Sequence, residues 1–375
     1  MESFSVIEAA AMPVLALNAG SSSLKFGLCM VDADATRVFV SGSAESGGAF
    51  DARDAEGKAL KCDARPIGTP QDAIEGIVDL LAATDFPMPA AIGHRIVHGG
   101  VACRHHTRID ARVMQQLEAA TPFAPLHVPA ALALVRSVHE CFPGIPQVAC
   151  VDTAFHAGMP DVARTLPIPR ELRAHGIERY GFHGLSCESI VRQLSADLPR
   201  RLVIAHLGHG ASVTAVASGR SIDTSMGLTP SGGVVMSTRC GDIDPGILEY
   251  LVRELHYDAG QLETLIDQRS GMMGISGLSG DMRELRAAAV SNADARLAIS
   301  MFCYSVRKQI GSMAMALGGI DMLVFTGGIG ENDVATRTSI CEGLDWFGVG
   351  SAGIRVMPSQ ENAQIAQHAW RNVAR

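Results

Sequence analysis

A short stretch near the start of the chain, Val14–Lys25, constrains the fold more than any other. It reads Val-Leu-Ala-Leu-Asn-Ala-Gly-Ser-Ser-Ser-Leu-Lys. The apolar residues 14–17 predict a buried strand, and Asn18–Gly20 predict a tight turn before three serines. Small residues let the backbone approach a ligand, and consecutive N–H groups with hydroxyls can surround phosphate oxygens. The stretch predicts either a phosphate loop with Lys25 as its mobile cation, or an ordinary β-hairpin whose second strand is Leu24–Met30.

Composition excludes several classes of protein. A chain of 375 residues is long enough for two domains. A net charge of −8 supplies no basic field for duplex binding. The first 13 residues lack a basic segment, so we expect no secretory signal, and no apolar run reaches the length of a membrane span. The nine cysteines are scattered, which favours reduced thiols and a cytoplasmic protein.

Apolar periodicity predicts alternating strands and helices along the chain. Further strands are expected at Leu24–Met30, Val38–Ser41, Ala91–Ile92, Val148–Val151, Leu202–Ala205, Val213–Ala217 and Met322–Phe325. Helices are expected at Pro70–Ala83 and Ala111–Ala119, from the Pro129 turn to about Glu140, from near Ser186, from Gly246, from Ala259, around Met282–Ser291, over Asp294–Leu317 and after Pro358. Each half of the chain opens with a strand, a Gly-rich turn and a strand, which indicates a weak internal duplication.

Three Gly-rich turns follow predicted strands, at Asn18–Ser23, His206–Ser212 and Thr326–Asn332. One such turn is weak evidence, because glycine commonly follows a strand. Three of them, two inside hairpins, indicate two related sheets that grip a phosphate chain in a cleft. We therefore predict an α/β protein with the two-domain actin/hexokinase-like (ASKHA) fold. Each domain would be a mixed sheet flanked by helices, with the active site in the interdomain cleft. The P-loop and dinucleotide patterns are absent from the sequence.

Six segments, in order along the chain, resemble those of the acetate kinase family. They are Asn18–Lys25, Gly93–His98, Asp152–His156, Tyr180–Gly184, Arg239–Pro245 and Thr326–Asn332. The resemblance runs from about Val14 to about Ala366. It implies a homodimeric, cytoplasmic enzyme that uses Mg²⁺ (or Mn²⁺) and ATP/ADP to phosphorylate acetate reversibly to acetyl phosphate. Propionate kinases share these motifs, so the sequence leaves the choice between acetate and propionate open.

The resemblance also implies a role for each matching residue. Asn18 would contact the metal, and Glu361 in the C-terminal segment is the candidate for a second metal ligand. Lys25 would contact nucleotide phosphates. Arg95 and Arg239 would hold the substrate and the transferring phosphoryl group, Asp152 would be the active-site carboxylate, and His183 would stabilise the transition state. The nucleotide would be lined by His206, Leu207, Gly208, His209, Gly210, Asp281, Met282, Arg283, Gly328, Ile329, Gly330, Glu331 and Asn332. The substrate's alkyl group would meet Val97, Leu126, Phe182 and Pro230.

These roles agree with the chemistry. A carboxylate nucleophile is already ionised at neutral pH, so the enzyme needs cations and positioning more than a general base. We therefore interpret Asp152 as a positioning or metal-water group. For each arginine the alternative is a structural ion pair, and for His183 and His206 it is a hydrogen-bonded core histidine. His94, His98, His127 and His156 could be any of these, and no histidine spacing is diagnostic of zinc.

The chain departs from the family pattern in three places. His209 replaces the usual asparagine of the second Gly-rich turn, Cys240 replaces a serine, and Val128 replaces an asparagine. The loop before Arg239 also carries smaller residues than usual. His209 is the most consequential, because it would touch phosphate. None of the changes removes a charge that the chemistry needs.

We expect an N-terminal domain over 1–152, joined by the segment 358–375, and a nucleotide-binding and dimerisation domain over 153–357. The expected partners are a small carboxylate, an adenine nucleotide and a second copy of the chain, with no nucleic acid or membrane. Two other functions stay open. One is a weakly active or non-catalytic nucleotide-binding regulator, and the other is a pyrophosphate-dependent carboxylate kinase. The second is disfavoured because residues 327–330 leave room for adenosine.

Overall fold

The computed structural model describes residues 10–20, 23–45, 48, 50–61, 67–344 and 353–374. Ser21 and Ser22 of the first Gly-rich turn, and most of the N-terminal extension, lie outside the described residues. The chain divides into two compact units. The first unit runs to Ala154 and includes the residues from Gln360 onward, and the second is Phe155–Ser359. Each unit contains one sheet, and the two are described separately.

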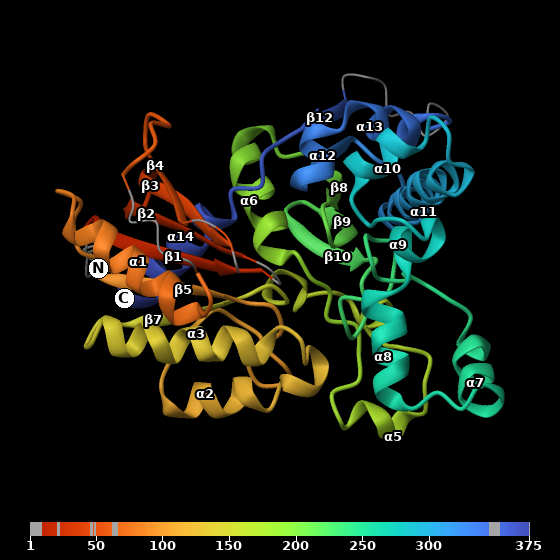
Figure 1. Ribbon diagram of the computed structural model, residues 1–375, viewed down its shortest axis with the longest axis horizontal. Helices are drawn as coiled ribbons and strands as arrows, with labels where there is room; N and C mark the ends of the chain where they lie inside the picture. The colour runs from red at the N-terminus through yellow and green to blue at the C-terminus, as the bar shows by residue number, and fades with distance from the viewer. Residues whose placement is uncertain are drawn as a thin grey trace, which may run out of the picture. The chain divides into compact units, whose positions relative to one another are not determined.

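The first unit is built on a mixed sheet in the order β4-β3-β2-β1-β5-β7-β6 (Figure 1). Its strands are β1 Met12–Ala19, β2 Ser23–Val31, β3 Thr36–Glu45, β4 Phe50–Asp54, β5 Ala91–Ile96, β6 Thr107–Arg108 and β7 Gln147–Val151. β1 pairs antiparallel with β2 and parallel with β5. The five strands predicted in this unit are present, and each is longer than expected. Asn18 pairs with Lys25 inside the β1–β2 ladder, so it belongs to the strand and not to a turn. Likewise, His94 and Arg95 lie within β5.

Helices cover both faces of this sheet (Figure 1). They are α1 Pro70–Ala82, α3 Val128–Cys141 and α14 Glu361–Val373, and α2 Ala111–Glu118 packs against α3. Side chains alternate between the two faces along a strand. Leu15 and Leu17 of β1 enter a core with α1 and α3. The opposite face is packed so closely that a Cβ at Gly93 of β5 would lie 2.6 Å from Ile365 of α14. Asn18 therefore projects from the face that α14 covers.

The second unit contains a five-stranded mixed sheet in the order β10-β9-β8-β11-β12. The strands are β8 Arg201–Leu207, β9 Ala211–Ala217, β10 Arg220–Thr224, β11 Met322–Thr326 and β12 Ile354–Val356. β8 pairs antiparallel with β9 and parallel with β11. The fold class predicted from the sequence, α/β with a mixed sheet flanked by helices in each part, is confirmed.

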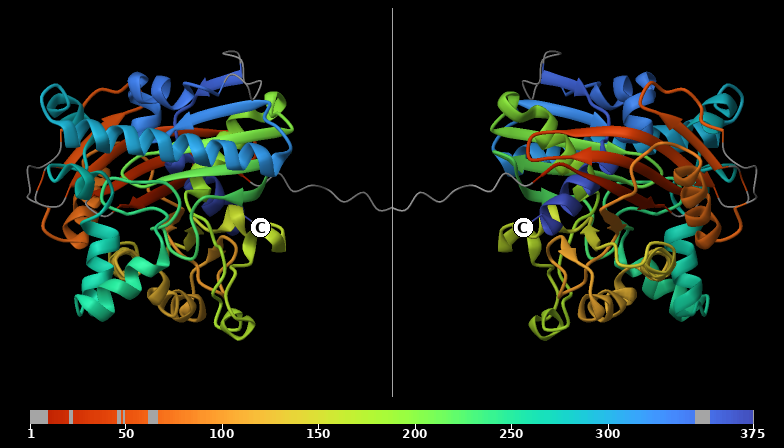
Figure 2. Two further views of the ribbon diagram at one scale, coloured as in Figure 1. Left: turned by 90° about the vertical axis from the view of Figure 1, so that its right-hand side faces the viewer. Right: turned by 90° about the vertical axis from the view of Figure 1, so that its left-hand side faces the viewer.

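The long helix α11, Ala293–Leu317, runs across this sheet (Figure 2) and packs on β8 and β9. On the other face, α6 (Gly184–Leu194) shares a core with β8 and β11. The remaining helices are α4 Asp161–Arg164, α5 Arg170–Arg173, α7 Pro245–Glu254, α8 Ala259–Gln268, α9 Gly271–Ser276, α10 Met282–Ala288, α12 Gly327–Asn332 and α13 Val334–Cys341. Within the described part of the chain, no helix combines the length and the apolar character that crossing a membrane requires.

Candidate active-site residues

Three neighbouring strands of the first unit carry Lys25, Asn18 and Arg95 in one row. Asn18 pairs directly with Lys25 across β1 and β2. Leu17 pairs with His94 in the parallel β1–β5 ladder, which places Arg95 beside Asn18. Residues that pair across strands project to the same face of a sheet. All three predicted site residues of these strands therefore share the face covered by α14, and Lys25 is exposed there.

Arg95 is held by two acceptors in this row. Its Nε donates to Asp152 Oδ2 at 2.8 Å, and its Nη2 lies 2.6 Å from the same oxygen. Its Nη1 donates to Asn18 Oδ1 at 3.1 Å. Burial alone would lower the pKa of Arg95, but the charges of Asp152 and Glu361 outweigh burial and hold the pKa above its ordinary value. The ion pair considered as an alternative for this arginine exists, and it fixes the orientation of the guanidinium group.

Glu361 is the first residue of α14, and its Oε2 accepts a hydrogen bond from Asn18 Nδ2 at 2.7 Å. The two predicted metal ligands are thus in direct contact, although they lie 343 positions apart. A carboxylate and an amide are the hard oxygen ligands that Mg²⁺ prefers. Their chemistry fits the predicted metal, which Glu361 and the side-chain oxygen of Asn18 would hold; in this structure that oxygen accepts from Arg95.

In the second unit, His183 immediately precedes α6 and adopts a left-handed backbone conformation, with φ at 58°. A hydrogen bond of 2.9 Å joins its Nδ1 to Ser212 Oγ. Its ring stacks on that of His206, with the centroids 4.2 Å apart. His206 Nδ1 in turn lies 2.8 Å from Ser186 Oγ. Both predicted histidines are therefore oriented through Nδ1 by a serine hydroxyl.

The turn between β8 and β9 brings His183 and Arg239 together at Gly210. A Cβ at Gly210 would lie 3.2 Å from Arg239 Nη1 and 3.3 Å from His183 Nε2. A larger residue would crowd both groups, which favours glycine at this position. Arg239 Nη1 also donates to the carbonyl of Pro230 at 3.3 Å. Arg239 and His183, two predicted site residues, thus lie close together at this turn.

His209, the residue that departs from the family pattern, lies at the tip of this turn. The residue is exposed, yet desolvation of its ring, and then the charge of Arg239, lower the pKa of His209 below its ordinary value. Asp281 opposes this shift. Asp281 caps α10, and its hydrogen bonds from Arg283 lower the pKa of that carboxyl to about 2. The charges of the predicted catalytic residue Arg239 and the predicted nucleotide residue Asp281 therefore both act on His209.

The third Gly-rich segment is the helix α12 itself, and it begins beside the second turn. A Cβ at Gly208 would lie 4.0 Å from the backbone nitrogen of Gly328. Gly327, with φ at 79°, approaches the carbonyl of Leu207 so closely that a Cβ there would lie 2.7 Å from it. Glu331 Oε1 accepts from the N–H groups of Gly327 and Ser359, each at 3.0 Å. In this structure Glu331 holds the start of its own helix.

Other predicted site residues lie apart from these contacts. Val97 and Phe182 are buried, whereas Leu126 is half exposed. Asn332 Nδ2 donates to the carbonyl of Gly328, and Met282 is buried. Sequence reasoning did not assign the serines at 186 and 212 that orient the histidines. Ser212 ends the second Gly-rich turn and could have been found there, but only the fold reveals Ser186.

Three of the four histidines whose roles the sequence left open are buried and form hydrogen bonds. His94 Nε2 lies 2.6 Å from Gln147 Oε1, and His98 Nδ1 accepts from the N–H of Gly100. His156 contacts Ser221 Oγ and the carbonyl of Phe182. Burial lowers the pKa of both His94 and His156 to about 4, so both rings are neutral at ordinary pH.

Comparison with known proteins identifies the family. A family model described as the Acetokinase family matches residues 13–369. The chain is 41% identical to the acetate kinase of Parabacteroides distasonis over 90% of this chain and 88% of that protein. It is 44% identical to that of Deinococcus deserti over 95% and 90%. Its structure resembles a propionate kinase from Francisella tularensis with a TM-score of 0.87 and 36% identity, covering 96% and 100% of the two chains. The resemblance drawn from the six sequence motifs is thereby confirmed, and the chain belongs to the acetokinase family.

Proposed function

We propose that the protein transfers the γ-phosphoryl group of ATP reversibly to the carboxylate of acetate or another short-chain acid, forming an acyl phosphate. The observation that carries the proposal is the fixed Arg95, held by Asp152 and Asn18 in a chain of the acetokinase family. The acceptor is already an anion, so the enzyme has to bring it to an anionic phosphate. A guanidinium group held in one orientation binds a carboxylate through two parallel hydrogen bonds. Its positive charge offsets the repulsion between the carboxylate and the phosphate.

Asp152 acts through Arg95 in this proposal. Its side chain is buried, and it accepts both nearby N–H groups of the guanidinium group. A general base is unnecessary because acetate has a pKa far below 7. Asp152 therefore orients the arginine and balances its charge. Asp152 is therefore a positioning group, and Arg95 is the group that contacts the substrate.

The second unit supplies the groups for the nucleotide. Arg239 and His183 lie next to Gly210, and the start of α12 lies beside Gly208. Backbone N–H groups in Gly-rich turns suit the oxygens of a polyphosphate. Charge on the transferring phosphoryl oxygens develops in the transition state, where an arginine and an imidazole N–H stabilise it best. We assign Arg239 and His183 to that role.

A divalent cation would be held by Asn18 and Glu361, whose oxygens fit Mg²⁺ or Mn²⁺. When bound, the ion neutralises charge on the phosphates. Val97 and Leu126 in the first unit, with Phe182 and Pro230 in the second, remain the candidates for contact with the substrate's alkyl group. One methylene changes selectivity by only about 1–3 kcal/mol. Relatives of this chain include both acetate and propionate kinases, so acetate and propionate are both proposed substrates.

A hydroxamate assay tests the proposal directly. The protein is incubated with ATP, Mg²⁺, hydroxylamine and acetate or propionate, and the acyl hydroxamate is measured. We expect acyl hydroxamate to form only when enzyme, ATP and the carboxylate are all present. Removal of the metal with EDTA should reduce its amount. Replacement of ATP by pyrophosphate serves as the control for the alternative donor. Product no greater than in a reaction without enzyme would refute the carboxylate kinase assignment.

We also propose that the protein is a cytoplasmic homodimer, formed through the second unit. Helices α7 and α8 bury none of their own residues. Apolar side chains stand exposed on α7 and just after it, and others on α11. They are Ile247, Tyr250, Val252, Leu255, Leu297, Met301 and Tyr304. Exposed apolar residues that recur on a helix are typical of an interaction surface. In sedimentation experiments Tyr250→Glu should shift the protein towards monomer, whereas the control Val162→Glu, at an isolated exposed valine, should not.

A further inference from the structure

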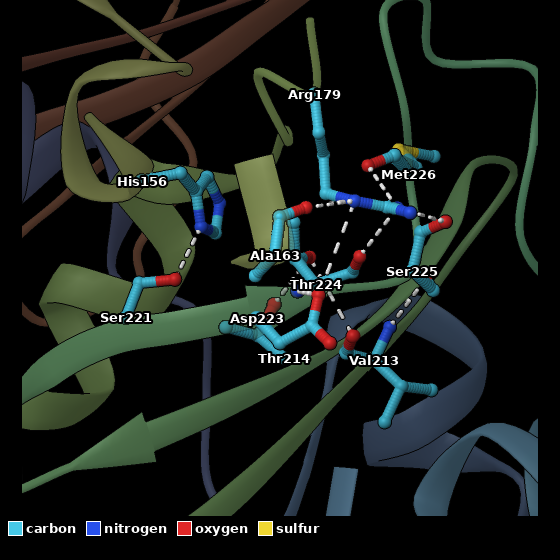
Figure 3. Close-up of polar contacts among 10 residues, drawn as sticks. All are labelled: His156, Ala163, Arg179, Val213, Thr214, Ser221, Asp223, Thr224, Ser225 and Met226. Carbon is cyan, nitrogen blue, oxygen red and sulfur yellow. Dashed lines mark hydrogen bonds and ion pairs between the residues drawn. The ribbon is translucent and has the colours of Figure 1, made fainter. Parts of the chain in front are cut away.

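Arg179 lies directly before the Tyr180–Gly184 motif and binds backbone carbonyls from two segments (Figure 3). Its Nε donates to the carbonyl of Ala163 at 3.0 Å. Its Nη1 donates to the consecutive carbonyls of Thr224, Ser225 and Met226 at 2.8, 3.4 and 3.2 Å. The carboxylate of Asp223 is more distant, at 3.9 Å from Nε. The planar group with its several donors thus closes a turn of converging carbonyls, which a lysine could satisfy only in part.

His156 holds the same motif from its other end. Its Nε2 lies 2.9 Å from the carbonyl of Phe182, which can only accept, so Nε2 carries the hydrogen. Its Nδ1 then accepts from Ser221 Oγ at 2.8 Å (Figure 3). Burial lowers the pKa of His156 to about 4, and this keeps the ring in that one neutral form. The carbonyl that precedes His183 therefore has a fixed donor.

The backbone between these two anchors has little freedom. Phe182 lies between two left-handed residues, Gly181 with φ at 73° and His183 with φ at 58°. The N–H groups of Tyr180 and Gly181 both donate to the carbonyl of Gly227, at 3.0 and 3.3 Å. A Cβ at Gly181 would lie 2.5 Å from Thr224 and 2.8 Å from His156. The motif is packed directly against the loop that Arg179 closes.

That loop is tied to β9, the strand that also orients His183. Thr224 Oγ1 lies 2.9 Å from Thr214 Oγ1 (Figure 3). Ser225 exchanges two hydrogen bonds with Val213, at 2.9 Å through its N–H and 3.0 Å through its Oγ. The next residue along the strand, Ser212, bonds the His183 ring. The backbone and the ring of His183 are therefore both positioned relative to one strand.

We propose that Arg179 and His156 are positioning residues for catalysis, which hold Phe182 and His183 in their working orientation. The inference rests on the proposed carboxylate kinase function and deepens it. Arg179 sets the backbone before Phe182 by closing the Thr224–Met226 turn, and His156 sets the carbonyl after it. Phe182 meets the alkyl group of the substrate and His183 meets the phosphoryl group. Loss of either anchor therefore changes both chain-length selectivity and turnover, beyond any effect on stability.

The first test compares Arg179→Lys with Arg201→Lys. Arg201 is a matched control in the same unit, because it also binds a backbone carbonyl, that of Gly318, and an aspartate, Asp321. The hydroxamate assay with acetate, propionate and butyrate gives kcat and KM. For Arg179→Lys we expect kcat to fall about tenfold to a hundredfold, and the acetate-to-butyrate ratio of kcat/KM to change by about fivefold. Arg201→Lys should leave kcat and the ratio as in wild type.

Hydrogen exchange measured by mass spectrometry provides a readout that does not depend on activity. Peptides that span residues 180–187 should exchange at least about threefold faster in Arg179→Lys than in wild type or Arg201→Lys. An inactive wild-type protein would refute only the proposed function. The hydrogen-exchange rates would still show whether Arg179 holds residues 180–187 in place. Unchanged exchange in Arg179→Lys, or unchanged selectivity in an active enzyme, would overturn the inference.

A pair of variants at position 156 tests the His156 anchor separately from Arg179. Glutamine at 156 can place a donor nitrogen near the position of Nε2, whereas leucine offers none. We therefore expect His156→Gln to keep most of the wild-type selectivity and His156→Leu to lose it, with thermal stability recorded for both. Equal selectivity in the two variants would show that the bond to Phe182 does not position the motif.

Discussion

At the scale of single residues, Arg239 carries the clearest catalytic prediction. Its Nη1 lies next to Gly210, together with His183 Nε2. Arg239→Ala should lower kcat far more than it raises the KM for ATP, because the phosphoryl charge that Arg239 meets develops in the transition state. The loss of transition-state stabilisation should be roughly 2.7–4 kcal/mol. Arg239→Lys should not restore the rate, since the planar fork is lost. Steady-state kinetics check this, and activity within a few-fold of wild type would contradict the assignment.

His209 carries a prediction about pH. In the free protein its pKa is lowered by desolvation and by Arg239, whereas bound polyphosphate would raise the pKa by favouring the charged ring. Nucleotide affinity should therefore rise as pH falls through the pKa of the complex, and level off below the pKa of the free protein. Calorimetric dissociation constants for ADP between about pH 5 and 8 test this against His209→Asn. Parallel curves for the two proteins would show that His209 does not meet the phosphates.

The sequence predicts the identity of the chemical groups better than their partners. The six motifs single out Arg95, Asp152 and His183 as candidates, and their roles remain predictions. The motifs do not reveal that Asn18 binds both Arg95 and Glu361. Such contacts arise from the register of β1 against β5 and from the placement of α14. Both are tertiary features that no local spacing encodes.

At the scale of elements, the contact of α14 with β5 is critical because it places Glu361. Gly93→Ala would put a Cβ 2.6 Å from Ile365 and 3.2 Å from Ala369, so the helix must shift. We expect a loss of about 1–3 kcal/mol in unfolding free energy and an increase in the Mg²⁺ concentration that gives half-maximal activity. Urea unfolding and metal titration measure these. Gly158→Ala, where a Cβ would meet nothing within 4 Å, is the control, and equal behaviour of the two variants would refute the prediction.

Long apolar runs predict elements well, whereas polar residues obscure where the elements end. The helix α1 matches its expected range to one residue, helped by the Thr69 capping box and Pro70. The turn expected at Asn18 is instead a strand, because pairing with Lys25 outweighs the low strand preference of asparagine. The short helix α9 was not predicted at all. Its glycines disfavour a helix, and its packing against α11 supplies the stability.

At the scale of the whole molecule, the two sheets share one plan. In the first, the antiparallel strands β3-β2-β1 are followed by the parallel strands β5 and β7. In the second, the antiparallel strands β10-β9-β8 are followed by the parallel strands β11 and β12. The duplication inferred from two strand–turn–strand patterns is therefore present in the topology. The order of parallel strands could not be read from the sequence, since it depends on pairing between distant segments.

Each unit also contains a deeply buried neutral histidine, His94 in the first and His156 in the second. Burial lowers the pKa of both to about 4, against about 6.5 in an unfolded chain. The unfolded state therefore binds more protons below pH 6.5. The stabilisation from keeping each ring neutral is complete above that pH and is lost as pH falls towards 4. Each histidine should account for about 3 kcal/mol over this window.

Urea unfolding at a series of pH values between about 4.5 and 7.5 measures this linkage. His94→Gln keeps a donor for Gln147 but cannot take up a proton, so its unfolding free energy should fall less steeply than that of wild type as pH decreases. His139→Gln, at an exposed position of α3, should follow the wild-type slope. The carboxylates titrate alike in all three proteins, which leaves the difference in slope to the buried ring. A wild-type slope for His94→Gln would mean that His94 becomes protonated in the folded protein as readily as in the unfolded chain.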